Sequence, residues 1–171
     1  MNASTQMSDE VRQSANFFRR LLVATVLAGT LDITYACVVS YFRGRMPLTV
    51  LQSVASGWLG PAAYSGGVGT ALLGLVTHYG IMSVMAATFG LAAARIARLR
   101  QRPWSSGLLY GAGLYAVMYG IVLPLRFPAI FPRLNGWITV SDIIVHVGVG
   151  LIIARVFCAA AGEESRRTPL D

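Results

Sequence analysis

The chain has 171 residues, of which 55% are hydrophobic and only 12% are charged. A soluble domain carries about 25% charged residues, so this composition excludes an ordinary soluble protein and indicates one embedded in lipid. The basic residues are all arginine and the formal net charge is +7. Because these arginines fall in short groups between apolar runs, they do not form the basic face that a nucleic-acid partner would need.

Four apolar runs are each close to or above the roughly 18 to 20 residues that a helix needs to cross a bilayer. In chain order they cover residues 21–42, 68–94, 106–125 and 137–157. Helices satisfy their own backbone hydrogen bonds in lipid, and these runs lack the alternation of strands. The sequence therefore predicts an all-α integral membrane bundle of four transmembrane helices, flanked by tails at 1–20 and 158–171.

The first connection contains a further predicted helix. Pro47 suits a first helical position, and apolar residues then recur at three- and four-residue spacing at Leu48, Leu51, Val54, Ala55 and Trp58. The opposite face carries Gln52, Ser53 and Ser56. Two interpretations remain open. This short amphipathic helix is either a connector on the outer surface or a lid over a pocket between the spans, whose lining would then include Gln52, Ser53, Ser56, Tyr79 and Tyr119.

The third connection is rich in proline. Pro124, Pro128 and Pro132 argue against continued helix there, so an extended segment is predicted, with Asn135 as a cap for the fourth helix. Small residues predict where helices approach closely. Gly107 and Gly111 form a GxxxG pair in the third span, and Ala86, Gly90 and Ala94 recur at four-residue spacing in the second.

The arginines also predict an orientation. Ten of them lie in the N-terminal tail, in the second connection and near the C-terminus, whereas four lie in the first and third connections. Under the positive-inside rule, the side with the excess faces the cytoplasm. Both tails, at 1–20 and 158–171, are therefore predicted to be cytoplasmic, and the polar start of the chain favours a retained first span over a cleaved signal.

Ionisable residues are rare within the predicted spans. They are Asp32, His78, Asp142 and His146, and the two histidines are the only ones in the chain. Counting about 1.5 Å per residue from the span ends places Asp32, His78 and His146 at similar depth, with Asp142 about 6 Å nearer the outer surface. We therefore expect one intramembrane polar cluster in the middle and outer parts of the bundle.

Three interpretations of this cluster are open. It could fix the helix packing through hydrogen bonds, conduct protons or a small solute, or hold a haem or a metal ion through the paired histidines. Asp142 and His146 are four residues apart and so can face one neighbour together. No GxSxG motif surrounds Ser141, and nothing in the pattern identifies a metal or cofactor, which favours a protein that is not an enzyme.

Three stretches resemble a group of small uncharacterised bacterial inner-membrane proteins. They are GTLDI at 29–33, LQSVASGWLGPAAYSGG at 51–67 and ALLGLVTH at 71–78. The resemblance implies a four-helix protein of the bacterial inner membrane and implies no activity. It includes Asp32 and His78, and so favours a shared role for these two residues.

The function expected from the sequence is that of a non-enzymatic subunit that packs against itself or against a larger membrane complex. The expected partners are the lipid bilayer and a second copy or another membrane subunit, without nucleic acid. A small-solute or proton-linked transporter is the main alternative, and a haem- or metal-binding redox subunit is the third.

Overall fold

The computed structural model describes residues 3–132 and 134–167 and is 90% helical. Four helices in the described part are long and apolar enough to cross a membrane. They are α1 (Ala3–Phe42), α3 (Gly67–Arg95), α7 (Gly136–Arg167) and a continuous helix formed by α5 (Pro103–Val117), the π-helical turn η2 (Met118–Val122) and α6 (Leu123–Arg126). The chain is therefore a multi-pass membrane protein, and the predicted all-α four-helix fold is confirmed.

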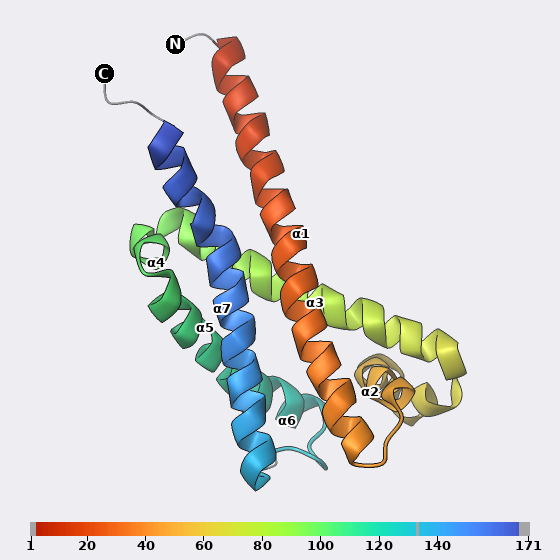
Figure 1. The fold of residues 1–171 in the computed structure, drawn as a ribbon. Coiled ribbons are helices and arrows are strands. Elements are labelled where there is room, and N and C mark those ends of the chain that lie inside the picture. The colour runs from red at the N-terminus through yellow and green to blue at the C-terminus, as the bar shows by residue number, and fades with distance from the viewer. Residues whose placement is uncertain (1–2, 133, 168–171) are drawn as a thin grey trace.

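Both chain termini lie at one end of the bundle (Figure 1). We call this the terminal end, and it also holds α4 (Ala97–Gln101). The opposite loop end holds α2 (Pro47–Leu59), the 3-10 turn η1 (Gly60–Ser65), α6 and the segment 127–135. Within the bundle α7 packs on α5 and on α1, while α1 also packs on α3. Helix α1 therefore stands between α3 and α7.

Glycines set the close contact between α5 and α7. A Cβ atom added to Gly111 would lie 2.4 Å from the backbone oxygen of His146, and one added to Gly107 would lie 2.8 Å from the Cα atom of Leu151. On the facing helix, a Cβ atom at Gly150 would meet the backbone of both glycines. Only glycine fits at such backbone-to-backbone contacts, so the GxxxG pair is the contact surface that holds these two helices together.

Helix α2 is docked tightly on the first turns of α3. A Cβ atom at Gly74 would lie within 1.9 Å of the Leu51 carbonyl oxygen, so the two backbones touch there. The Gln52 amide is buried and donates to the carbonyl oxygen of Gly67 at 3.1 Å. At the other end of α2, Arg126 of α6 donates to the carbonyl oxygen of Gly57. Contacts to both α3 and α6 therefore fix α2 across the loop end.

Helix α2 does not pack its apolar face on the protein, as an amphipathic helix of a soluble protein would. The polar residues Gln52 and Ser56 are buried with Ala55 against α3, whereas Leu48 and Trp58 are exposed. This arrangement is physically reasonable in a membrane, because lipid accepts the apolar side while the polar groups find partners inside the protein.

Two further details differ from the sequence-based expectations. The helix of the third span continues past Pro124 to Arg126, because η2 widens just before the proline, with the Leu123 N–H donating to the Met118 carbonyl. That wider turn accommodates a residue that lacks an N–H group. The following segment forms a turn, since the N–H groups of Ile130 and Phe131 both donate to the Phe127 carbonyl. The predicted extended segment is therefore wrong at this point.

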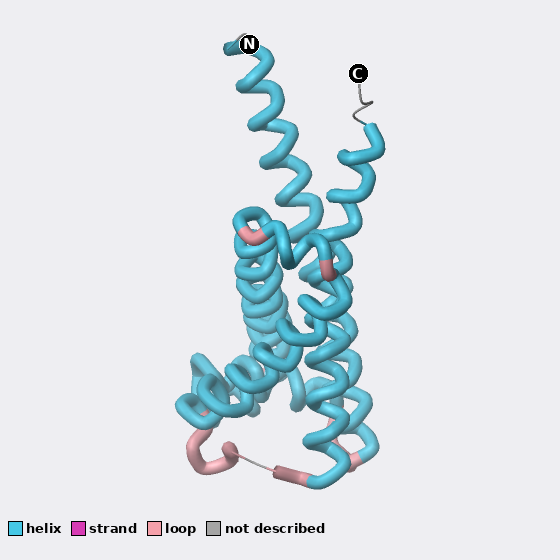
Figure 2. The backbone as a smooth tube through the Cα atoms, turned by 90° about the vertical axis from the view of Figure 1, so that its left-hand side faces the viewer, coloured by secondary structure: helices cyan, strands magenta, loops and turns pink. Residues whose placement is uncertain are grey.

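The tails are helical over most of their described length. Helix α1 begins at Ala3 and α7 runs to Arg167, so both helices continue well beyond the end of α3 (Figure 2). Residues 1–2 and 168–171 of the predicted tails lie outside the described residues. At the start of α7 the backbone N–H of Asn135 donates to Thr139 Oγ1 at 2.8 Å. The hydroxyl of a threonine within the helix therefore satisfies the Asn135 N–H.

The apolar core fills the terminal half of the bundle. It combines small residues of α1 and α3 with larger side chains of α3 and α7, including Met82, Phe89, Val149, Ile153 and Phe157. The Tyr110 hydroxyl on α5 donates to the Met85 carbonyl of α3 at 2.7 Å and joins these two helices there. The predicted polar residues lie on the loop-end side of this core.

Candidate functional site

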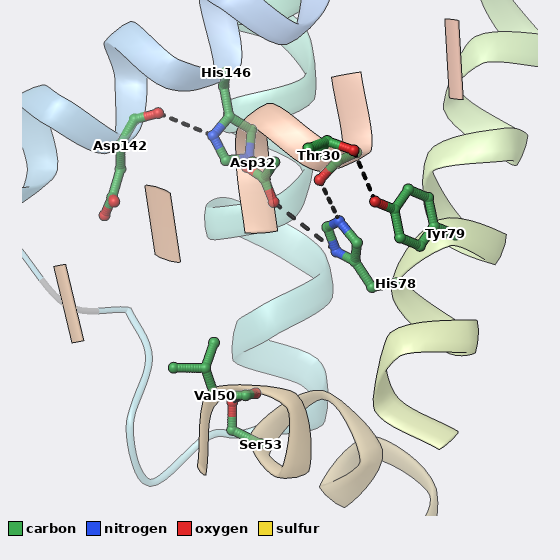
Figure 3. Close-up of polar contacts among 9 residues, drawn as sticks. Thr30, Asp32, Val50, Ser53, His78, Tyr79, Asp142 and His146 are labelled. Atoms are coloured by element: carbon green, nitrogen blue, oxygen red, sulfur yellow. Dashed lines mark hydrogen bonds and ion pairs between the residues drawn. The ribbon is translucent and has the colours of Figure 1, made fainter. Parts of the chain in front are cut away.

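Asp32, His78 and His146 come together from three helices. They belong to α1, α3 and α7, and their side chains point toward one another (Figure 3). Asp32 Oδ2 lies 4.0 Å from His78 Nδ1, with the two side chains 21% and 8% exposed. The Asp32 carboxylate is also within electrostatic reach of His146. Because α1 stands between the other two helices, its aspartate is placed between the two imidazoles.

The orientation of the His78 ring is fixed by a backbone group. Its Nε2 atom lies 2.9 Å from the carbonyl oxygen of Gly29, one turn before Asp32 on α1. A carbonyl oxygen only accepts hydrogen bonds, so Nε2 must carry the proton and donate. The other ring nitrogen, Nδ1, is then left to face the Asp32 carboxylate. A lone pair on Nδ1 would repel the carboxylate, so this contact favours a proton on one of the two groups.

The His146 ring is also oriented by a backbone carbonyl, but through Nδ1 instead of Nε2. Its Nδ1 atom donates to the carbonyl oxygen of Asp142, four residues earlier on α7, at 2.9 Å. The two residues therefore meet through the main chain, and the Asp142 carboxylate is left for other partners. The His146 imidazole lies within electrostatic reach of the Asp32 carboxylate.

The three side chains form a site whose charge depends on its protons. With both imidazoles neutral and Asp32 ionised, Asp32, His78 and His146 together carry a charge of −1. One added proton makes the site neutral and a second makes it positive. Because charge is costly within a membrane, these charge states differ in free energy. The 4.0 Å separation of Asp32 and His78 is too long for a hydrogen bond, so no short bond locks the proton in place.

Asp142 belongs to a second polar group nearer the loop end. The Tyr35 hydroxyl donates to Asp142 Oδ1 at 2.7 Å and lies 2.6 Å from the Ser141 hydroxyl. Tyr35 is three residues after Asp32 on α1, so both face α7. Tyr35 is not among the predicted site residues, although its three-residue spacing from Asp32 could have identified it. Ser141 had been considered only as a nucleophile, whereas it acts here as a hydrogen-bond partner.

Aromatic rings cover His146 on the side of α5 and η2. Tyr115 and Tyr119 are stacked with ring centroids 4.6 Å apart, and His146 meets each ring edge-on. Tyr119 lies within the π-helical turn and is close enough to Asp142 to interact with it. The turn that accommodates Pro124 therefore also positions a tyrosine against this polar group.

The residues proposed for a lid do not all gather around the cluster. Gln52 and Ser56 are buried between α2 and α3, while Ser53 donates to the Val50 carbonyl and lies away from the histidines (Figure 3). The Tyr79 hydroxyl pairs with Thr30 at 2.8 Å on the exposed side of α1. Of the five predicted residues, Tyr119 meets the His146 ring edge-on and Tyr79 meets the His78 ring edge-on, whereas the other three lie on α2. Helix α2 is accordingly a brace on α3 one turn from His78 rather than a cover with its own polar lining.

The described donor atoms do not suit a haem or a metal ion. Paired axial ligation of a haem would need one free nitrogen from each histidine pointing into a common gap, but His78 directs Nδ1 at Asp32 and commits Nε2 to Gly29. Among the residues that the structure describes, no three His, Cys, Asp or Glu side chains converge as a metal site. The arrangement instead suits the holding of a proton.

Comparisons with protein-family models, with curated proteins and with solved structures found no match. The three stretches at 29–33, 51–67 and 71–78 nevertheless meet in space. Gly29 and Asp32 contact His78, and Gln52 donates to Gly67. The fold and the site define the class of protein, a multi-pass membrane protein with an intramembrane Asp/His cluster.

The bond between Tyr35 and Asp142 should couple α1 to α7. Substituting Tyr35→Phe removes only the hydroxyl, so we expect a loss of about 0.6 to 1.7 kcal/mol, the range of interhelical hydrogen bonds in membranes. In a double-mutant cycle with Asp142→Ala, which removes the accepting carboxylate, measured by unfolding in detergent micelles, the two effects should not add. Additive effects would contradict a direct bond. Tyr64→Phe, a change on exposed η1, is the matched control.

Proposed function

We propose that the protein binds and releases protons at Asp32 and works as a small proton-linked carrier in the membrane. One observation carries this proposal. Each histidine donates one N–H to a backbone carbonyl, at Gly29 and at Asp142, while His78 Nδ1 faces Asp32 and His146 lies within electrostatic reach of the same carboxylate. Such an arrangement holds a proton without fixing it to one atom. Intramembrane carboxylates and imidazoles are the groups that proton-coupled transporters use.

The position of the apolar core determines the end of the bundle from which protons reach the proposed site. Because this core fills the terminal half, the site is separated from the terminal end and is nearer to the loop end, where Tyr35, Ser141 and Asp142 extend it. Proton exchange is then expected with the compartment at the loop end in this conformation. Passage to the other side would require a rearrangement of α1 against α3 and α7, as alternating access does in carriers.

We further propose that the protein resides in the bacterial inner membrane with both termini in the cytoplasm. The positive-inside rule supports this orientation, since both termini lie at the end of the bundle where most arginines gather. The loop end would then face the periplasm, and the site would take up protons from there.

Infrared difference spectroscopy of the purified protein is the direct test. Lowering the pH should produce the carbonyl band of a protonated carboxyl group, with matching changes in imidazole bands. The same preparation in sealed vesicles with an internal pH dye should show proton flux above that of protein-free vesicles. Absence of both signals would contradict the proposal.

A packing or complex-associated subunit is the second candidate. It is favoured by the third span, in which only 11% of the most apolar window is buried, compared with 28% in the second span. Leu108 and Leu109 of α5 are exposed there. Native mass spectrometry after mild extraction should then find a dimer or a bound partner that is lost in Leu109→Ser. A bare monomer under these conditions would contradict this candidate.

A further inference from the structure

A groove opens at the terminal end, far from the Asp/His cluster. It arises because α1 and α7 continue beyond the point where α3 ends at Arg95, so the inner face of α1 is left uncovered (Figure 2). The groove has a volume of about 620 Å³, within the size range of small-ligand sites. Its lining comes from α1, α3, α4 and α7 and includes Glu10, Ser14, Arg20, Arg100 and Phe157.

The floor of the groove is basic. Arg20 and Arg100 both line it, and together with Arg155 they surround the Cys158 thiol within electrostatic reach. Arg100 is held by two hydrogen bonds from one guanidinium nitrogen to the carbonyl oxygens of Ala93 and Ala94. Its remaining N–H groups are left for a ligand, since an arginine has five. A positioned arginine beside a second one suits a phosphate group.

Among the residues that the structure describes, the lining has one acidic side chain, and it lies at the other end of the groove. Glu10 is ten residues before Arg20, which is about 15 Å along a helix. Among the described lining residues, no carboxylate therefore lies beside the two arginines. Between them, Gln13, Ser14 and Asn16 offer neutral polar groups.

The level of the floor fits the surface of the bilayer. Arg20 directly precedes the apolar run 21–42 on α1, and Arg100 follows the end of α3. Apolar residues follow Arg20 directly along α1, whereas Phe17, one turn before Arg20, packs on Phe157 with 5.6 Å between ring centroids. A ligand with a phosphate at the arginines and acyl chains beside the bundle would match this change from charge to apolar surface.

We propose that this groove binds the headgroup of an anionic phospholipid, with its phosphate on Arg20 and Arg100. Basic pockets between helix ends at the membrane surface are recognised sites for such headgroups. The lipid would complete the terminal end, where α1 and α7 separate from α3. This inference concerns a site separate from the Asp/His cluster, and it stands or fails independently of the proposed proton function.

Native mass spectrometry of the full chain in detergent, titrated with phosphatidylglycerol or phosphatidylcholine, tests the proposal. We expect tighter binding of phosphatidylglycerol, reduced about fivefold by Arg20→Gln, since one arginine near a lipid surface contributes about 1 kcal/mol. The matched control is Arg43→Gln, a change of the same kind at the loop end, which should leave binding unchanged. Equal binding of both lipids, or equal loss in the control, would overturn the proposal.

A second variant covers the case in which Arg20→Gln fails to fold. Ser14→Glu adds a negative charge within the groove on the exposed surface of α1 and should also weaken phosphatidylglycerol binding. Inorganic phosphate and glycerol 3-phosphate serve as soluble probes in a thermal-shift assay. If they stabilise the protein as much as the lipid does, the site is one for a soluble phosphate and the lipid proposal is wrong.

Discussion

Substitution of Asp32 by asparagine should abolish proton flux in reconstituted vesicles and remove the carboxyl band that appears on acidification. Asparagine keeps the size of the side chain but has no titratable group, so the two histidines lose the negative charge that faces them. The protein should remain folded, because an aspartate at the centre of a membrane costs about 2.5 to 3.5 kcal/mol on insertion scales and its removal relieves that cost.

Two further variants separate the proton function from a structural role. His78→Gln leaves an amide that can still donate to the Gly29 carbonyl but has no nitrogen that titrates, so flux should fall while the fold is kept. Glu10→Gln removes a carboxylate outside the cluster and should leave the flux unchanged. If Asp32→Asn carries protons as the original protein does, or if it loses stability with flux retained, the cluster is structural and the proposed function is wrong.

Substitution of Gly111 by leucine should separate α5 from α7 and destabilise the protein strongly. Its Cβ atom alone would lie 2.4 Å from the His146 carbonyl oxygen and 2.6 Å from the Val147 Cα atom. Both are backbone atoms of a packed helix and cannot move independently. Overpacking of this kind costs about 1 to 3 kcal/mol and occasionally more, which should appear as a lower melting temperature in detergent.

Gly113→Leu is the matched control for this experiment. It lies two residues further along the same helix, and a Cβ atom there would meet nothing within 4 Å. Both changes replace glycine by leucine in a helix, so the gain in helix propensity, about 0.8 kcal/mol, is common to the two variants. The difference between them therefore reports the helix contact alone. Equal melting temperatures would contradict the close approach of α5 and α7.

Part of this protein follows from the sequence alone. Hydrophobic length determines the four spans, and each predicted span lies within the helix that the structure assigns to it. Glycine spacing identified Gly107 and Gly111 as a contact surface because only glycine allows two backbones to touch. Counting residues from the span ends also placed Asp32, His78 and His146 at a common depth, since the rise of a helix is nearly constant.

The pairing of the polar groups followed only from the tertiary structure. Depth along a helix does not determine how the helix is rotated or which helices are neighbours. The position of α1 between α3 and α7 therefore decides that Asp32 is shared by two histidines. The same rotation brings the Tyr35 hydroxyl to the Asp142 carboxylate. His146 therefore contacts Asp142 only through the main-chain carbonyl oxygen of that residue.

Helix α2 also shows which features the sequence determines and which the tertiary structure decides. Residue spacing predicts an amphipathic helix over 47–59, but it does not say which face meets the protein, because in lipid the apolar side can point outward. Contact with Gly74 of α3 settles this question. The sequence thus determined how many helices cross the membrane and how deep each charged group lies. Helix packing decided which groups touch, because that depends on rotation about each helix axis.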